Sequence, residues 1–191
     1  MEENIFNAAL AGLLHDVGKI VQRARPDPWV RAQGTEGEGQ PVHATWSIAF
    51  IQASVPKPYQ AAALPGAYHH QPEKSPAANQ ALSRLVALAD HLSAGERADL
   101  GEENKQVHPP RQMVSIFDHL HLSKVVQPST SHYRPLSLLH LDEATLFPVD
   151  RQSEDDQGRA YDRLKTFLEG KIRQDSGDRE SYLENVLCQN H

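Results

Sequence analysis

Apolar residues recur at helical spacing over most of the first hundred positions. The first such stretch covers 4–24 and follows the i, i+3, i+4, i+7 pattern of one face of an amphipathic helix. Its apolar positions are Leu10, Leu13, Leu14, Val17, Ile20 and Val21. Pro26 and Pro28 follow directly, and proline ends a helix. The pattern therefore predicts a first helix over 4–24.

Three further helices are predicted before residue 100, at about 42–54, 58–69 and 78–97. A stretch rich in Pro, Gly, Glu and Gln, 26–41, separates the first helix from the second and predicts a long loop. The last of the three carries apolar residues that we expect to form its core stripe. These are Leu82, Leu85, Val86 and Ala89.

The pattern changes from Gly101 onward, where helical periodicity stops. Short apolar segments, Leu136 to Leu141 and Ala144 to Phe147, predict two short strands that could pair as a β-hairpin. Helical spacing then returns at roughly 158–173 and 179–188. The fold class predicted from these elements is mainly α: a helical bundle followed by a less regular tail with a short β-hairpin and terminal helices.

A polar cluster interrupts the first apolar stretch at His15-Asp16-Val17-Gly18-Lys19. Adjacent residues on a helix point about 100° apart, so His15 and Asp16 can offer a nitrogen and an oxygen to one divalent metal. Lys19 lies one turn beyond His15 on the same face. A His-Asp pair alone is weak evidence, because this composition yields about one by chance. A buried histidine bonded to a backbone carbonyl is the competing interpretation.

Other ligand-type residues lie on or beside each of the later helices of this region. They are His43, His69, His70 and Asp90. Short helices packed in a bundle can bring such groups to one site. Buried imidazoles and carboxylates need partners, and a metal ion satisfies all of them at once. The sequence thus predicts a metal site formed by groups far apart along the chain.

Two segments resemble a known family in residue identity as well as in spacing. They are 11–24, which contains Gly12-Leu13-Leu14-His15-Asp16-Val17-Gly18-Lys19, and 88–97, Leu-Ala-Asp-His-Leu-Ser-Ala-Gly-Glu-Arg. The His-Asp, His-His and Ala-Asp pattern resembles the HD superfamily of metal-dependent phosphohydrolases. The two segments together resemble the N-terminal HD domain of the large subunit of type III-A (Csm-type) CRISPR effector complexes. The resemblance covers about residues 1–105.

This resemblance implies a site and a reaction. The metal ligands would be His15, Asp16, His43, His69, His70 and Asp90, and the catalytic residues His15, Asp16 and Lys19. One or two divalent transition-metal ions are implied, Mn²⁺ or Ni²⁺ first and Co²⁺ or Fe²⁺ as alternatives. Metal-activated water would then hydrolyse phosphodiesters of single-stranded DNA. The implied partners are the other effector subunits, with CRISPR RNA and target RNA.

Composition and charge narrow the setting of this activity. No apolar run approaches the ~20 residues that cross a bilayer, and the acidic N-terminus is unlike a secretory signal, so we expect a cytoplasmic protein without a membrane. A net charge of -6 disfavours tight binding of nucleic acid by the chain alone.

The expected organisation is an HD nuclease domain over 1–105, a linker or small mixed segment over 106–175, and the start of a following domain over 176–191.

Two other functions fit the same residues. The first is an HD phosphohydrolase of nucleotides or cyclic dinucleotides, because the same ligands suit any phosphoester. The second is a non-catalytic module that docks other subunits and holds at most a structural metal. Comparing small phosphoesters with oligonucleotides separates the first alternative from the nuclease, and subunit binding without hydrolysis would favour the second.

Overall fold

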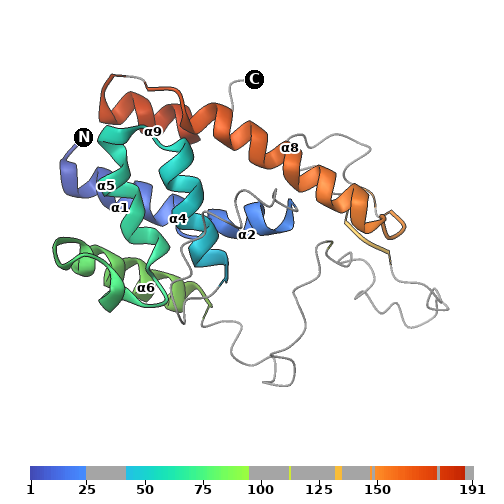
Figure 1. The fold of residues 1–191 in the computed structure, drawn as a ribbon, viewed down its shortest axis with the longest axis horizontal. Coiled ribbons are helices and arrows are strands. Elements are labelled where there is room, and N and C mark those ends of the chain that lie inside the picture. Colours follow the sequence, from blue (N-terminus) through green and yellow to red (C-terminus); the bar gives the residue numbers. More distant parts are fainter. Residues whose placement is uncertain are drawn as a thin grey trace.

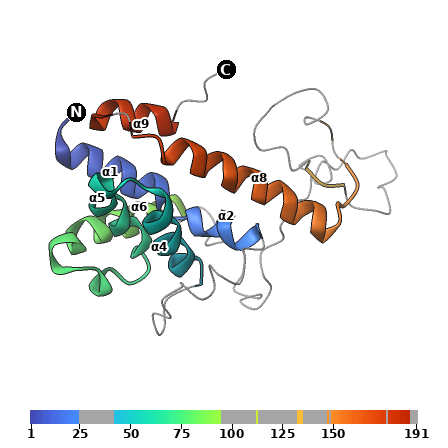
Figure 2. The ribbon, with the colours of Figure 1, turned by 45° about the horizontal axis from the view of Figure 1, so that its top comes forward.

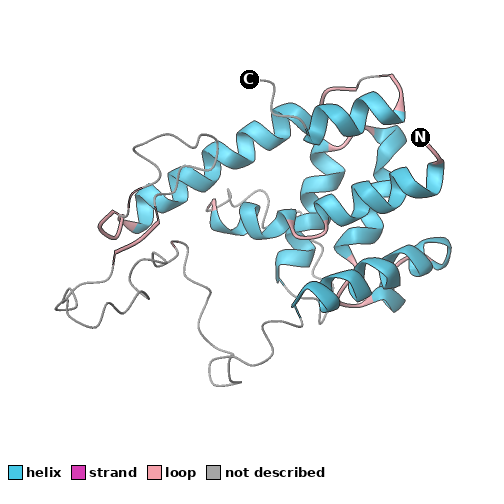
Figure 3. Cartoon of the chain, turned by 180° about the vertical axis from the view of Figure 1, so that it is seen from behind, coloured by secondary structure: helices cyan, strands magenta, loops and turns pink. Residues whose placement is uncertain are grey.

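The computed structural model describes residues 1–24, 42–94, 112, 132–134, 147, 149–175 and 177–187. Regular structure there is almost entirely helical (Figures 1 and 3). The α-helices are α1 (Glu3–Leu14), α2 (Val17–Arg23), α4 (Val42–Ser54), α5 (Lys57–Ala67), α6 (Gln80–Ala94), α8 (Glu154–Ile172) and α9 (Arg179–Leu187). Two 3₁₀ turns, η1 (Pro72–Lys74) and η2 (Ala77–Asn79), lead into α6. The prediction of a mainly α-helical bundle is confirmed.

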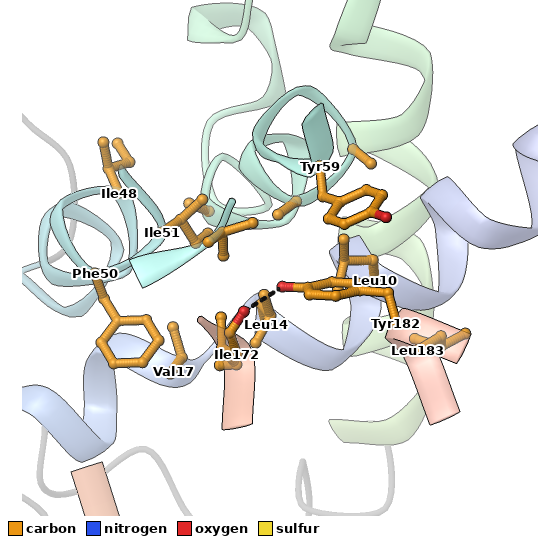
Figure 4. Packing of buried hydrophobic residues seen from close by; sticks show 14 of the residues in the cluster. Leu10, Leu14, Val17, Ile48, Phe50, Ile51, Tyr59, Ile172, Tyr182 and Leu183 are labelled. Carbon is orange, nitrogen blue, oxygen red and sulfur yellow. Dashed lines mark hydrogen bonds between the residues drawn. The ribbon is translucent and has the colours of Figure 1, made fainter. Parts of the chain in front are cut away.

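The core forms where α1 crosses the other helices of the bundle. Phe6, Leu10 and Leu14 lie one turn apart on α1 and are buried, so they form one continuous apolar edge. Ile51 of α4 packs into the same cluster (Figure 4). The α1 and α5 helices approach closely because Gly66 lies directly against the backbone of Ala11. This close crossing sets the distance between the residues that follow each helix.

The C-terminal helices α8 and α9 pack on this same core. Ile172 and Tyr182 are fully buried, and the Tyr182 hydroxyl donates a hydrogen bond of 2.9 Å to the Ile172 carbonyl (Figure 4). The Tyr182 ring stacks on Tyr59 of α5 with centroids 4.2 Å apart. In Figure 2, α8 runs from α9 past α2, which it contacts. The core that supports the N-terminal helices therefore includes residues from the end of the chain.

The predicted first helix, 4–24, is wrong as one continuous element. It is broken at His15 and Asp16, and Asp16 has φ -108° and ψ 9°, outside helical values. The cause is Ser47 on α4, whose hydroxyl accepts from the Gly18 N–H at 2.9 Å and donates to the His15 carbonyl at 3.1 Å. Those two backbone groups would otherwise bond within a helix. The chain therefore forms a turn at these two residues, and α2 begins at Val17.

The predicted core stripe of α6 is also wrong in part. Of the four residues, only Val86 is buried, whereas the side chain of Leu85 is 53% exposed. The face that packs inward instead carries Ser83 and Val86, with Asp90 half-buried one turn later. The helix is therefore rotated from the orientation that hydrophobicity alone predicts, and Leu85, Leu88 and Leu92 face outward.

The tail differs from its prediction at several boundaries. The α8 helix starts at Glu154, earlier than predicted, because the Ser153 side chain caps it by accepting from the Asp156 N–H at 3.1 Å. The loop 26–41 and the strands 136–141 and 144–146 lie outside the described residues. The described part of the tail contains no β-hairpin, only an isolated antiparallel bridge between Tyr133 and Val149. The domain boundaries near 105 and 175 stay a prediction.

No helix in the described ranges is both long enough and apolar enough to cross a membrane.

Candidate metal centre

Four separate places in the fold supply the ligand-type side chains of one site. The turn between α1 and α2 carries His15 and Asp16, and the first turn of α4 carries His43. His69 and His70 lie in the turn directly after α5, and Asp90 lies on the face of α6 that meets His15. Pro65 lies inside α5 and Pro72 begins η1, so the turn with the two histidines is bounded by prolines on both sides.

These six residues form two adjoining groups. Ligand atoms of His43, His69 and His70 lie within 4.8 Å of one another. Those of His15, Asp16 and Asp90 meet the same limit. Every residue predicted as a metal ligand therefore belongs to one of the groups, although binding itself stays a prediction.

Asp16 joins the two groups. Its Oδ2 lies 3.4 Å from His15 Nε2, and His15 Nε2 in turn lies 3.7 Å from Asp90 Oδ1. Its other oxygen, Oδ1, lies 3.6 Å from His43 Nε2 and 3.9 Å from His69 Nε2. One carboxylate thus presents one oxygen to each group, which is the arrangement expected of a ligand shared by two ions.

Backbone carbonyls fix the tautomers of two of the histidines. His15 Nδ1 donates to the Gly12 carbonyl at 2.6 Å, and His69 Nδ1 donates to the Gly66 carbonyl at 2.8 Å. A carbonyl oxygen can only accept, so the proton is on Nδ1 in both rings. In neutral rings, Nε2 then carries a lone pair, and in both rings it points into the site. This is the way in which metal-binding histidines are usually oriented.

Two buried polar atoms in the site lack a hydrogen-bond partner among the described residues. They are Asp16 Oδ1 and His69 Nε2, and the whole His69 side chain is only 1% exposed. An unpartnered buried acceptor costs about 1–3 kcal/mol, and more when it is charged. Both atoms are metal-ligand atoms, and they face each other across 3.9 Å. The donor set and these unpartnered acceptors fit a divalent cation.

The protonation states of three of the four histidines also suit metal binding, and the fourth differs. Burial lowers the pKa of His43 to about 4, and burial likewise lowers the pKa of His69 and of His70 below the ordinary histidine value. These three imidazoles are therefore neutral at pH 7. A hydrogen bond with Asp16 has the opposite effect on His15 and raises its pKa, although burial partly offsets this.

The carboxylate at the centre is held in its charged form. Burial alone would raise the pKa of Asp16, but hydrogen bonds with His15 and Lys19 outweigh it and lower the pKa well below its usual value. Lys19 Nζ donates to Asp16 Oδ2 at 2.5 Å, and the lysine side chain is 44% exposed. Lys19 therefore positions Asp16.

Sequence reasoning missed Ser47, which positions the site without belonging to either ligand group. Its side chain is fully buried, and its hydroxyl holds the turn through Gly18 and His15. The spacing of polar residues within an otherwise apolar helix, 42–54, was the one available signal. That spacing does not indicate which residues Ser47 contacts.

Replacing Ser47 with alanine is expected to loosen the turn. Two buried backbone groups would lose their partner, so we expect a loss of about 1–3 kcal/mol in the free energy of unfolding. Mn²⁺ affinity should fall about 10–100-fold, as for other residues that orient ligands. Denaturant unfolding and isothermal titration calorimetry measure the two effects. Ser83→Ala is the control, because Ser83 is equally buried but its hydroxyl has no partner in the described part. An equal loss of Mn²⁺ affinity in both variants would contradict the role of Ser47.

The chain was compared with curated proteins, solved structures and protein families. No curated protein and no solved structure matches the chain. The HD-domain family matches residues 1–95. That range contains all six ligand-type residues, Lys19 and Ser47. Residues 1–95 therefore form an HD domain, the domain of metal-dependent phosphohydrolases.

Proposed function

We propose that this HD domain hydrolyses phosphodiester bonds of single-stranded DNA as part of a type III-A (Csm-type) CRISPR effector complex. The observation that carries the hydrolytic part is the meeting of two ligand groups at Asp16, with Asp16 Oδ1 and His69 Nε2 buried and unpartnered in the described residues. The DNA substrate and the effector complex are supported by segments 11–24 and 88–97, which resemble the N-terminal domain of that family's large subunit.

The chain's own residues would prepare the site before substrate arrives. His43, His69 and His70 would hold one ion and His15 and Asp90 another, with Asp16 shared. A divalent cation supplies Lewis-acid charge at the phosphoryl group and for the attacking water. The hydrogen bond and ion pair with Lys19 keep Asp16 ionised, so no proton has to leave this carboxylate when an ion binds. The exposed part of Lys19 adds positive charge where an anionic substrate approaches.

The donor set also supports a choice of ion. Four imidazoles and two carboxylates form a nitrogen-rich site. Imidazole suits first-row transition metals, whereas Mg²⁺ prefers oxygen ligands. We therefore propose Mn²⁺ or Ni²⁺, with Co²⁺ and Fe²⁺ as alternatives.

The acidic charge of the chain supports a role inside an assembly. Binding of single-stranded DNA draws much of its affinity from lysines and arginines, and this chain carries a net charge of -6. We propose that neighbouring effector subunits, together with CRISPR RNA and target RNA, bring the strand to the site. The metal centre itself would then contribute mainly to hydrolysis and only a little to the affinity for DNA.

The test compares substrates on one preparation of the full 191-residue chain. We expect cleavage of an unstructured, end-labelled DNA oligonucleotide in Mn²⁺, much slower cleavage of the matched duplex, and none in EDTA. Product lengths on a denaturing gel measure all three. Rapid hydrolysis of nucleotides or cyclic dinucleotides with an intact oligonucleotide would overturn the DNA substrate in favour of the small-molecule phosphohydrolase. Absence of hydrolysis of every phosphoester with all four metals would overturn the hydrolytic function.

A further inference from the structure

A pocket of about 370 Å³ lies between α1 and α6, directly beside the metal centre. From α1 it is lined by Ala8, Gly12 and His15, and from α6 chiefly by Leu85, Ala89 and Asp90. His15 and Asp90 therefore face both the pocket and the ligand groups. Pockets for small organic ligands span about 300–1,000 Å³, so this one is large enough for a single ring system.

The room in this pocket comes from small residues at helical spacing. Ala8 and Gly12 lie one turn apart on one face of α1, and Ala89 lines the pocket from α6. A Cβ atom added at Gly12 would meet nothing within 4 Å. At Gly66, by contrast, an added Cβ atom would collide with the backbone of Ala11, because α1 and α5 touch there. Gly12 is thus not needed for packing among the described residues, and it leaves open space.

The lining is apolar except at the end that meets the metal centre. The Leu85 side chain is 53% exposed although it borders the pocket, which leaves apolar surface available to a ligand. Ser93 adds one hydroxyl, and that hydroxyl donates to the Asp90 carbonyl at 3.0 Å. Among the described residues that line the pocket, none is a lysine or an arginine. A second phosphate is therefore a poor fit, and a flat apolar ring is a good one.

We propose that this pocket binds the nucleobase of the nucleotide whose phosphate lies at the metal centre. The inference rests on the proposed function and deepens it. Continuity through His15 and Asp90 places any ligand in the pocket next to the scissile group. Aliphatic side chains pack against the face of any base by burying apolar surface, and the single hydroxyl gives little means of telling bases apart. The enzyme then requires a nucleobase at this position but shows little preference among the different bases.

The kinetic test uses two oligomers with the same number of phosphates. One is oligothymidylate, and the other carries 1′,2′-dideoxyribose without bases at every position. In Mn²⁺, we expect kcat/KM to be about ten-fold higher for the base-bearing oligomer, because part of one base face would be buried against apolar side chains. Gly12→Leu fills the pocket and should reduce this ratio to about two-fold or less. The matched control is Gly170→Leu, another helical glycine with open space around it, on α8, which should retain the ratio.

Binding is measured separately, because it does not need hydrolysis. In an NMR titration of the metal-free chain, thymidine 5′-monophosphate should shift the amide signals of Gly12 and Ala89, and deoxyribose 5-phosphate should not. Gly12→Leu should remove the shift at Ala89. Thermal melting checks that the variant folds, and Ala8→Leu replaces it if it does not.

The outcomes separate this inference from the proposed function. Equal kcat/KM for the two oligomers, or an unchanged ratio in Gly12→Leu, overturns the base pocket and leaves hydrolysis standing. Absence of all hydrolysis overturns the proposed function, and the NMR shifts at Gly12 and Ala89 then decide the pocket alone. Shifts as large with hexyl phosphate as with thymidine 5′-monophosphate would overturn the nucleobase in favour of an alkyl group.

Discussion

Replacing Asp16 with alanine is expected to abolish metal-dependent hydrolysis, with kcat/KM falling by on the order of a thousand-fold or more. Asp16 provides the only carboxylate that reaches both ligand groups among the described residues. Its loss removes the carboxylate shared by the two groups and leaves Asp90 as the one acidic residue beside their four imidazoles. It also leaves Lys19 without its partner. Initial rates on a labelled oligonucleotide in Mn²⁺ measure the effect.

A second measurement distinguishes lost chemistry from lost folding. Asp16→Asn keeps the shape of the side chain but not its charge, so it should retain the fold while Mn²⁺ affinity, measured by calorimetry, falls sharply. Asp162→Ala is the matched control, because Asp162 is an exposed acid on α8, outside both ligand groups. Hydrolysis by Asp16→Ala within about ten-fold of the wild-type rate would contradict the central role of Asp16.

Removal of Asp16 should also change how stability depends on pH. Its pKa is lowered in the folded chain, so the ionised carboxylate stabilises the fold above the ordinary aspartate pKa. That contribution is lost as pH falls through the lowered value. In the metal-free chain, wild type and Asp16→Asn should therefore differ in unfolding free energy at neutral pH, and the difference should shrink in acid.

The proximity of the six candidate ligands was predictable from sequence, because histidines and acids are unusual residues at positions within or beside apolar helices. His15 and Asp16 interrupt an apolar face, and two consecutive histidines precede Pro72. Such groups are costly to bury without a common partner, which is why residues distant in sequence could be assigned to one place. Their juxtaposition needed only a bundle of short helices. The structure places them together as that argument expected.

The local geometry of the motif was not predictable in the same way. Apolar residues keep their helical spacing on both sides of the polar cluster, so the pattern over 4–24 does not predict a turn at Asp16. The break depends on Ser47, on a different helix, and on hydrogen bonds across 29 and 32 residues. A pattern within one segment cannot contain that information. A continuous helix would have directed His15 and Asp16 to different surroundings.

The prediction of which face of α6 is buried failed for a related reason. Two faces of this helix were available, one with Leu85 and Ala89 and one with Ser83, Val86 and Asp90. Hydrophobicity favours the first face. The structure buries the second, where Asp90 reaches His15, and exposes Leu85. The orientation that brings Asp90 to the site is also the one that leaves apolar residues beside the pocket, so the error in the prediction coincides with the proposed base-binding surface.

Replacing Gly18 with alanine is expected to destabilise the fold and disturb the metal centre together. A Cβ atom at Gly18 would collide with the His43 carbonyl and would lie 2.5 Å from the Ser47 backbone nitrogen. These are backbone atoms of α4, so they cannot rotate out of the way. Overpacking of this kind costs about 3 kcal/mol, which for a chain of this size lowers the melting temperature by about 6–12 °C.

The collision lies at the crossing that joins the two ligand groups. Gly18 follows the turn that carries Asp16, and His43 provides an imidazole to the other group, so separation of α2 from α4 should move Asp16 Oδ1 away from His43 Nε2. Mn²⁺ affinity should therefore fall along with stability. Differential scanning calorimetry with and without Mn²⁺ measures both, since the metal-induced rise in melting temperature should shrink in the variant.

Gly170→Ala is the matched control for this substitution, because a Cβ atom at Gly170 meets nothing within 4 Å. Alanine there should raise stability by up to about 1 kcal/mol, since glycine is the poorer helix former. Unchanged melting and unchanged Mn²⁺ stabilisation in Gly18→Ala would contradict the close crossing. The glycine of the His-Asp-x-Gly-Lys motif would then need a reason other than the approach of α4. With the crossing intact, its role is steric: it lets two helices come close enough for one carboxylate to reach both ligand groups.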